Sequence, residues 1–315
     1  MEFLESKEKE VLIITHIADI DGMGSAILGR LIFPKLDILL CETNDLLTSL
    51  PDVFLKQNNY KEIYMCDLSF PKEMIETIEN TSLKDKFHHF DHHISGLCSA
   101  NYPWSCVIPE KDGLKPSGTS LFYDYLCHLK KYPILEKNAI KEFVEAIRSY
   151  DTWTFEQDKN YIGRYLTDIF SMIGPNAFIL KYTEYLKQLD NQFILSTFDQ
   201  ELVHIKENEM ERYIDECDKN LIKTDFLGHK VGISISEQFR SSLGNRLSEK
   251  YKDTLDFILI VDFHRHSFSM RTVNDVDLSS IAQTLGGGGH KKAAGFPMDK
   301  ENIEKIFPLI QQNLK

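Results

Sequence analysis

Short apolar runs alternate with helical patterns through the first half of this 315-residue sequence, and this alternation constrains the fold more than any other feature. The apolar runs read as buried strands, and they lie at Val11–Thr15, Ile38–Cys41, Glu62–Cys66 and Phe87–Phe90. Helical patterns lie at Met23–Phe33, Pro71–Ile78 and Ser117–Leu129. Strands that alternate with helices form βαβ units with a mostly parallel sheet. We therefore predict an α/β fold whose functional residues gather at the carboxyl ends of the strands.

The second half predicts a helical region and then a smaller α/β unit. Residues 138–220 are mainly helical in pattern, and Glu201–Asn220 has no Pro or Gly, as a long connecting helix requires. The later pattern gives a strand at Lys230–Ile235, a helix at Phe239–Tyr251 and a helical stretch at Leu278–Thr284. Between these helices, Leu255–Asp262 and Ser267–Val273 are two strands that could form a hairpin. We therefore predict a first domain at 1–190, a helical linker at 191–225 and a second domain at 226–315.

Composition argues against several classes of protein. With 42% hydrophobic and 27% charged residues, the chain is neither disordered, nor collagen-like, nor a disulfide scaffold. No apolar run approaches the roughly 18 residues of a membrane span. The first ten residues lack the apolar core of a signal peptide and the six cysteines form no CxxC pair, so we expect a cytoplasmic protein with reduced thiols. The net charge of −12 argues against a broad grip on long nucleic acid, although residues 264–295 are locally basic.

Acidic residues and histidines follow the strands and one helix of the predicted first domain. They are His16, Asp19, Asp21, Asp67, Asp91, His92, His93 and Asp151. A single aspartate after a strand is more often a cap or turn residue than a ligand, and Asp19 and Asp21 could simply cap the next helix. Together, however, these groups can converge at one sheet edge, where carboxylates repel unless cations neutralise them. Carboxylates and imidazoles without thiolates suit Mn²⁺, and two ions about 3.5–4 Å apart form the clamp of phosphoester hydrolysis.

These motifs and their order resemble the DHH/DHHA1 phosphoesterase superfamily. The D-H-H at 91–93 is preceded by an H-x-x-D-x-D-G segment and followed far downstream by GGGGHKKAAGF, and the resemblance covers nearly the whole chain. It implies a DHH catalytic domain that binds two Mn²⁺, with Mg²⁺ or another divalent ion as an alternative, and a DHHA1 substrate-binding domain. The implied ligands are His16 and Asp19 for one ion, Asp21, His92 and Asp151 for the other, and Asp67 as a bridge.

The resemblance also implies roles for the remaining residues of the D-H-H motif. His93 would face the scissile phosphate, and Asp91 would accept a hydrogen bond from a ligand imidazole and fix its tautomer. The chain departs from the family in the spacing from His16 to Asp19, which is three residues where relatives commonly have two or four. The place of His16 among the ligands therefore stays open.

The glycine run at 286–289 is either a flexible turn or a backbone surface that a ligand can approach closely. Successive amides without side chains can form an anion-binding nest. The resemblance implies that the non-scissile part of a nucleotide is held by Gly287, Gly288, Gly289 and His290, with Arg271 on its phosphate or sugar. Arg240 and Asn245 are weaker candidates, for which an exposed helix surface is an equal interpretation.

We expect hydrolysis of short single-stranded RNA or dinucleotides to mononucleotides from one end, because the stretch around Tyr150–Trp153 is similar to the nanoRNase B branch. Trp153 and Phe155 could offer a stacking face for a base, although Trp153 could equally be core. One alternative is a phosphatase of 3′-phosphoadenosine 5′-phosphate. Another is a catalytically idle nucleotide-binding protein, against which the complete ligand set argues. We further expect a site in the cleft between the domains, no binding to long duplexes or membranes, and a monomer or homodimer.

Overall fold

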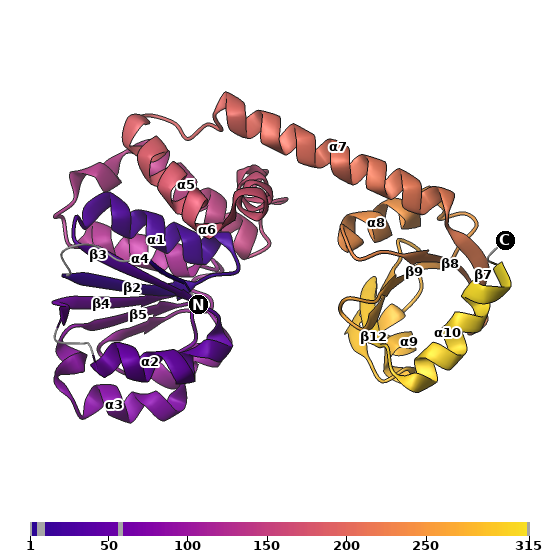
Figure 1. Cartoon of the computed structure of the whole chain (residues 1–315), viewed down its shortest axis with the longest axis horizontal. Coiled ribbons are helices and arrows are strands. Elements are labelled where there is room, and N and C mark those ends of the chain that lie inside the picture. The colour runs from indigo at the N-terminus through magenta and orange to yellow at the C-terminus, as the bar shows by residue number, and fades with distance from the viewer. Residues whose placement is uncertain (1, 5–9, 56–58, 314–315) are drawn as a thin grey trace. The chain divides into compact units, whose positions relative to one another are not determined.

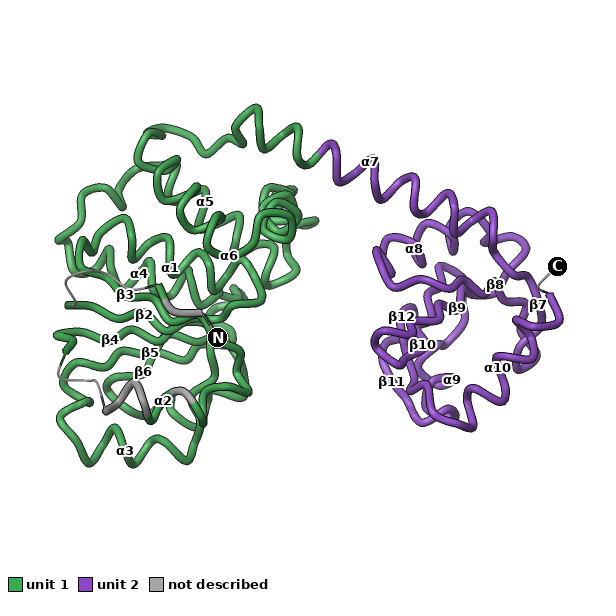
Figure 2. Tube along the Cα trace, viewed as in Figure 1, with its two compact units in different colours: residues 1–203 green, residues 204–315 purple. Residues whose placement is uncertain are grey.

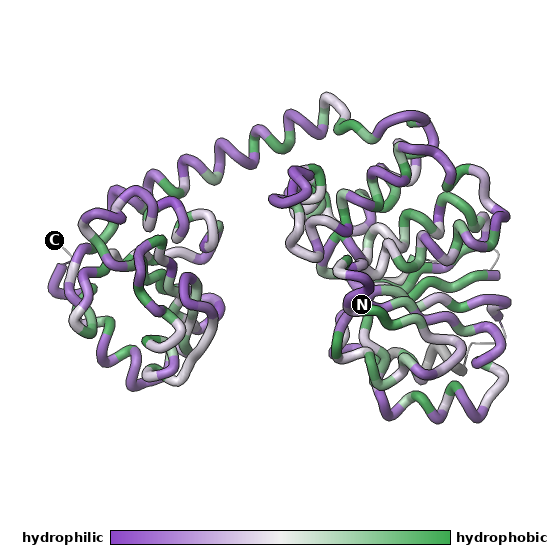
Figure 3. The backbone as a smooth tube through the Cα atoms, turned by 180° about the vertical axis from the view of Figure 1, so that it is seen from behind, coloured by the Kyte–Doolittle hydropathy of each residue, from purple (hydrophilic) through white to green (hydrophobic). Residues whose placement is uncertain are grey.

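The computed structural model describes residues 2–4, 10–55 and 59–313 (Figure 1). The chain divides into two compact units, residues 1–203 and 204–315, and the division falls inside helix α7 (Thr197–Lys219) (Figure 2). Figure 3 shows α7 as mostly hydrophilic along its length. The domain bounds drawn from the sequence stay a prediction. Within the described part of the chain, no helix combines the length and apolar character needed to cross a membrane.

A six-stranded sheet forms the centre of the first unit, in the order β1-β3-β2-β4-β5-β6. Only β1 pairs antiparallel to its neighbour, and the other adjacent strands run parallel. The strands are β1 (Glu2–Leu4), β2 (Val11–His16), β3 (Leu36–Cys41), β4 (Glu62–Cys66), β5 (Phe87–Asp91) and β6 (Ser105–Val107). The predicted α/β class and all four predicted strands are confirmed. The sequence analysis missed β1 and β6, which have three residues each.

Helices cover both faces of this sheet, as Figure 1 shows. They are α1 (Ile20–Ile32), α2 (Leu46–Leu55), α3 (Ile75–Glu79), α4 (Gly118–His128), α5 (Asn138–Asp151) and α6 (Ile162–Gln188). One core packs α1, α4, α5 and α6 on a face of the sheet that includes Ile13, and the other face, which includes Leu12, packs on α2 and α3. The helix predicted from Pro71 is shorter than expected, because a 3-10 turn at Lys72–Met74 precedes α3.

Helix α1 begins three residues before the predicted start at Met23. Its N-cap is Asp19, whose carboxylate accepts hydrogen bonds from the backbone amides of Asp21 at 3.1 Å and Gly22 at 3.0 Å. A Cβ on Gly22 would lie 2.0 Å from the carbonyl oxygen of His16, so only glycine permits this close approach. The start of α1 is thereby held against the end of β2, and both carry candidate ligands.

The second unit contains another six-stranded sheet, in the order β11-β12-β10-β9-β8-β7. Its strands are β7 (Ile222–Phe226), β8 (His229–Ile235), β9 (Phe257–Asp262), β10 (Ser267–Arg271), β11 (Gly288–His290) and β12 (Ala293–Pro297). Only β8 and β9 pair in parallel, and the predicted β9–β10 hairpin is confirmed. The α9 (Leu278–Thr284) and α10 (Lys300–Asn313) helices share one core with the sheet, and α8 (Arg240–Lys250) shares another with the end of α7.

Part of the glycine run forms a strand, which excludes the flexible turn that was one of the two alternatives for this segment. Gly288 and Gly289 belong to β11, which pairs antiparallel with β12 through Gly288↔Gly295 and Gly289↔Ala294. A Cβ on Gly287 would lie 2.1 Å from the carbonyl oxygen of Gly295, and Gly289 has a φ of +139°. The run is therefore glycine-rich partly because two backbones lie too close for side chains.

Candidate active site

The first unit brings its sequence-predicted site residues together at the carboxyl ends of three neighbouring strands. β2 ends at His16, Asp67 directly follows β4, and β5 ends at Asp91, just before the two histidines. The helical layer supplies the rest, from the start of α1 and the end of α5. Potential ligand atoms lie within 4.8 Å of one another in three groups: His16, Asp19 and Asp67; Asp21, His92 and Asp151; Asp67, His92 and His93.

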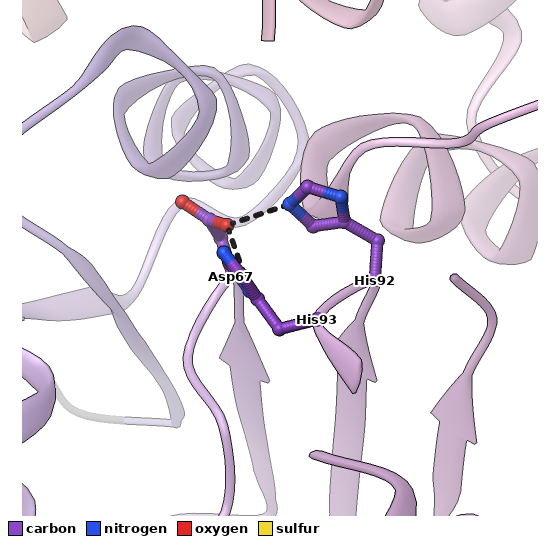
Figure 4. A group of neighbouring side chains, drawn as sticks. All are labelled: Asp67, His92 and His93. Atoms are coloured by element: carbon purple, nitrogen blue, oxygen red, sulfur yellow. Dashed lines mark ion pairs between the residues drawn. The ribbon is translucent and has the colours of Figure 1, made fainter. Parts of the chain in front are cut away.

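Asp67 lies at the centre of this cluster and belongs to two of the three groups. Its Oδ1 is 3.4 Å from His92 Nε2 and 3.9 Å from His93 Nδ1, and Figure 4 shows both rings directed at the carboxylate. Its Oδ2 is 3.7 Å from His16 Nδ1. Asp67 is 2% exposed and has a left-handed φ of +54°, a strained backbone that surrounding contacts must hold in place.

The first turn of α4 packs directly behind Asp67. A Cβ on Gly118 would lie 2.8 Å from both the nitrogen and the Cα of Asp67, so this position requires glycine. The same turn holds Asp21, whose carboxylate accepts hydrogen bonds from the amides of Gly118 at 2.6 Å and Thr119 at 2.9 Å. The Thr119 hydroxyl donates to the Asp21 carbonyl. Free amides at a helix N-terminus favour a negative charge, so α4 stabilises the buried Asp21 carboxylate and fixes its orientation.

Asp91 is fully buried and orients His93. Its Oδ1 accepts hydrogen bonds from His93 Nδ1 at 2.7 Å and from the amides of His92 and His93. Its Oδ2 accepts from the hydroxyl of Ser69 at 3.1 Å. The hydrogen bond to Asp91 raises the pKa of His93. Because Asp91 occupies Nδ1, Nε2 is the ring nitrogen of His93 that remains for a ligand.

The electrostatics of the cluster fit a divalent cation. Three of its buried atoms, Asp67 Oδ2, His92 Nε2 and Asp151 Oδ2, have no hydrogen-bond partner within the described residues. Burial, together with the neighbouring Asp21 carboxylate, raises the pKa of Asp151 to about 8 and that of Asp67 well above its ordinary value. Buried acceptors without partners are unfavourable, and a cation would supply the missing partner. Oxygen and imidazole donors without thiolates match Mn²⁺ or Mg²⁺ better than structural zinc.

The raised pKa of Asp151 predicts a pH-dependent stability of the metal-free protein. The pKa of this carboxyl is about 8 in the folded chain, whereas its ordinary value is 3.8. Between pH 3.8 and pH 8 the folded chain therefore binds one more proton than the unfolded chain. The contribution of Asp151 to the free energy of unfolding is fully present below about pH 4 and is lost as the pH rises through about 8. In a chelator, the unfolding temperature of the wild type should therefore fall relative to that of Asp151→Asn between about pH 5 and pH 8. Parallel curves would contradict a buried, protonated carboxyl.

Two residues near the cluster were not predicted from the sequence. Glu42 directly follows β3, and its Oε2 lies 3.1 Å from His16 Nε2. The hydrogen bond that His16 Nδ1 donates to Asp19, with a further contribution from Asp67, raises the pKa of His16 to about 11. The rule that parallel strands end at one edge would have found Glu42. Ser69, which holds Asp91, gives no comparable signal in the sequence.

The aromatic residues after Asp151 divide into one buried and one exposed side chain. Phe155 is 8% exposed, so the expectation that it offers a stacking face is wrong. Trp153 is 73% exposed, which excludes the alternative that it belongs to the core.

In the second unit, Arg271 and His290 lie on the same line across the sheet. Arg271 pairs with Ala293 on β12, and Ala293 pairs with His290 on β11. Directly opposed residues point to the same face of a sheet. The Arg271 stem lies so close to α8 that a Cβ on Gly244 would be 2.5 Å from its Cγ. Its guanidinium is half-buried, which lowers its pKa, and no carboxylate among the described residues forms an ion pair with it.

The weaker candidates on α8 are differently placed. Arg240 forms an ion pair of 3.0 Å with Asp262, which is 1% exposed. This partner gives Arg240 a structural contact, whereas Asn245 is exposed on the helix surface. Of the three polar candidates, Arg271 alone combines partial burial with an unpaired charge in the described structure.

The neighbouring glycines Gly287 and Gly288 predict different effects of the same substitution. Gly287→Ala should destabilise the second unit, because the added Cβ meets the backbone of Gly295 and Phe296 at 2.1–2.6 Å. Gly288→Ala should leave thermal unfolding nearly unchanged, since its Cβ meets nothing within 4 Å. If Gly288→Ala still weakens nucleotide binding, measured by calorimetry, the loss reflects closer approach of a ligand to this backbone. Equal unfolding temperatures for the two variants would contradict the packing described for Gly287.

Comparisons with known proteins give four findings. Residues 230–315 match the DHHA1 domain family. The chain is 32% identical over 294 residues to "Oligoribonuclease NrnB" of Bacillus subtilis, covering 91% of this chain and 72% of that protein. It is 25% identical over 345 residues to the uncharacterized protein R106 of Acanthamoeba polyphaga mimivirus, covering 98% and 75% of the two chains. The fold is similar to that of the "pGpG-specific phosphodiesterase" PggH of Vibrio cholerae, with a TM-score of 0.53, 14% identity and coverage of 96% and 98%.

Proposed function

This chain belongs to the DHH/DHHA1 family of phosphoester-hydrolysing enzymes, and we propose that it cleaves short oligoribonucleotides or dinucleotides to mononucleotides with two bound Mn²⁺ ions. The observation that carries the proposal is the pair of ligand groups joined through Asp67, in a chain 32% identical to an oligoribonuclease. The buried, unpartnered atoms of that cluster support a cation there.

Two of the three groups supply the proposed ligands, and the third, Asp67 with His92 and His93, brings Asp67 beside His92. His16, Asp19 and Asp67 would hold one ion, and Asp21, His92 and Asp151 the other, with Asp67 common to both. Ions in this position would neutralise phosphate charge and lower the pKa of an attacking water. Asp21, held by the amides of α4, and Asp67, held in a strained conformation, would keep their orientation before substrate arrives.

His93 would act on the phosphate through its free ring nitrogen. Its raised pKa favours an imidazolium, and the hydrogen bond to Asp91 fixes the orientation of the ring. Nε2 would then hold a proton for a phosphate oxygen or for the leaving oxygen. In the second unit, Arg271, His290 and the glycines of β11 would bind the non-scissile part of the nucleotide.

A panel of labelled RNA and DNA oligonucleotides of two to ten residues, assayed with Mn²⁺ and with Mg²⁺, tests this proposal. We expect mononucleotide release with Mn²⁺, fastest for the shortest RNA substrates. Faster phosphate release from 3′-phosphoadenosine 5′-phosphate than cleavage of any dinucleotide would favour the phosphatase alternative. Tight nucleotide binding without turnover of any phosphoester would support the catalytically idle alternative.

We place this activity in a reducing, cytoplasmic compartment. All six cysteines are free, and Cys41 and Cys66 are buried in the core. A disulfide-free chain with buried thiols is typical of such a compartment. Whether the enzyme is a monomer or a homodimer is a separate prediction, which light scattering at assay concentration would test.

A further inference from the structure

Trp153 occupies a backbone position that folding alone would give to glycine. Helix α5 ends at Asp151, and Trp153 follows it with a left-handed φ of +62°. The amide of Trp153 donates to the carbonyl of Tyr150 at 3.1 Å, and the amide of Thr154 donates to that of Ser149 at 2.9 Å. These two hydrogen bonds define the Schellman motif, in which the left-handed residue is usually glycine. A tryptophan here is strained, and such strain is typical of functional positions.

A hydrogen-bond network holds the turn that carries this tryptophan. Arg148 Nη2 donates to Asp158 Oδ2 at 2.9 Å, and the same oxygen accepts from the hydroxyls of Thr154 at 2.6 Å and Ser149 at 2.9 Å. The indole also packs against two aromatic rings. Its centroid lies 5.9 Å from that of Tyr150 and 5.3 Å from that of Phe155, whose ring plane is inclined at 85° to the indole. These contacts hold the turn in place, although 73% of the Trp153 side chain remains exposed. An exposed indole on a rigid support is poised for a planar ligand.

The position of Trp153 beside the ligand groups points to the nature of that ligand. Asp151, two residues earlier, belongs to the group with Asp21 and His92. Two trans peptide bonds span at most about 7.6 Å, so the Cα of Trp153 lies within this distance of the Cα of Asp151. The tryptophan is therefore attached close to the proposed site of phosphate cleavage. Aromatic side chains stack on nucleobases regardless of base identity, because every base has a π-face.

We propose that the exposed indole of Trp153 stacks on the base of the nucleotide adjoining the scissile phosphate. The inference rests on the proposed function and assigns the recognition of one base to the catalytic unit itself. Stacking without hydrogen bonds to base edges gives affinity with little sequence preference. The enzyme would accordingly accept all four bases at this position but discriminate against a substrate that lacks the base.

Kinetics on matched substrates separate stacking from a structural role. Trp153→Gly places the preferred residue at the left-handed position, so its unfolding temperature should be unchanged or higher. Its KM for a Mn²⁺-dependent dinucleotide reaction should nonetheless rise about 5- to 150-fold, the range expected for loss of one stacked base. For the same dinucleotide without the adjoining base, wild type and variant should have equal KM values. Trp153→Phe should recover part of the loss. The control variant is Phe198→Ala, which removes another exposed aromatic side chain, on α7, and should leave KM unchanged. Alanine is used there because Phe198 lies in a helix, where glycine would be destabilising.

Fluorescence gives a second measurement that does not require turnover. The chain has two tryptophans, and the other, Trp104, is 5% exposed. Titration with adenosine or guanosine monophosphate should quench wild-type emission, and Trp153→Phe should abolish this response. Normal dinucleotide cleavage with identical KM values in wild type and Trp153→Gly would overturn the stacking inference and leave the proposed function intact. Quenching by mononucleotides in a protein that cleaves no dinucleotide would refute the proposed function but support stacking of Trp153 on a base.

Discussion

Asp67→Ala should abolish phosphodiester cleavage, with kcat reduced at least about 1,000-fold, equivalent to about 4 kcal/mol of barrier. The reason is geometric, since Asp67 lies in one group with His16 and Asp19 and in another with His92 and His93. Its removal would take a ligand from both proposed ions. Calorimetric titration with Mn²⁺ should show weaker binding and a lower metal stoichiometry than in the wild type.

Stability measurements distinguish this effect from simple unfolding. Burial and the nearby Asp21 and Asp19 raise the pKa of Asp67, so removing its carboxyl should not destabilise the metal-free protein through lost charge interactions. Mn²⁺ should raise the unfolding temperature of the wild type but barely that of the variant, because a ligand stabilises only a fold that binds it. Asp112→Ala is the matched control, since Asp112 is exposed and has the same φ of +54°. Full metal content and near-normal turnover in Asp67→Ala would refute the two-metal assignment.

Arg271→Ala should produce the second large effect, but on binding rather than on chemistry. A contact with a remote phosphate or sugar stabilises the ground state and the transition state equally, so its loss raises KM while kcat stays nearly constant. For dinucleotides we expect kcat/KM to fall about 10- to 100-fold, as for loss of a hydrogen bond of about 1.5–3 kcal/mol to a charged group. Cleavage of bis(p-nitrophenyl) phosphate, which has no remote phosphate, should barely change.

Two further variants separate the charge of Arg271 from its packing on α8. Arg271→Met keeps an unbranched stem against Gly244 and should bind dinucleotides as poorly as the alanine variant. Arg271→Lys should recover part of the affinity, because an ammonium supplies charge without the paired donors of a guanidinium. Arg246→Ala, which removes an exposed arginine paired with Glu211 on α7, should behave as wild type. Equal losses on the dinucleotide and the generic ester would make Arg271 a residue of the chemical centre or a structural one.

The sequence predicted the first sheet well because its signals are local. Val11–Thr15 and Glu62–Cys66 are apolar enough to read as buried strands, and parallel connectivity followed from the helices between them. That connectivity was enough to predict that His16, Asp67 and His92 would meet, although they are far apart in the chain. The contacts depend on one topological rule, which is why the sequence could reveal them.

The parts that were missed depend on contacts between distant segments. Nothing near Gly118 indicates that its missing Cβ makes room for Asp67, or that its amide holds Asp21. The strand within the glycine run was missed because a run of glycines shows no alternation of apolar and polar residues, although Gly288 and Gly289 pair with β12. Phe155 was expected to be open to a base, but its packing on Tyr150 and Tyr161 buries it.

The glycine strand β11 also has a consequence for solubility. Among the described strands it pairs only with β12, so its outer side is a sheet edge whose backbone groups are open to pairing with another chain. Covering that edge would remove the amides that a nucleotide is proposed to reach. Protection against edge-to-edge aggregation must then come from other features, namely the three-residue length of β11 and the exposed Lys291 and Lys292 that follow it. A second copy of the same edge would bring four of these lysines close together, and their like charges would oppose the pairing.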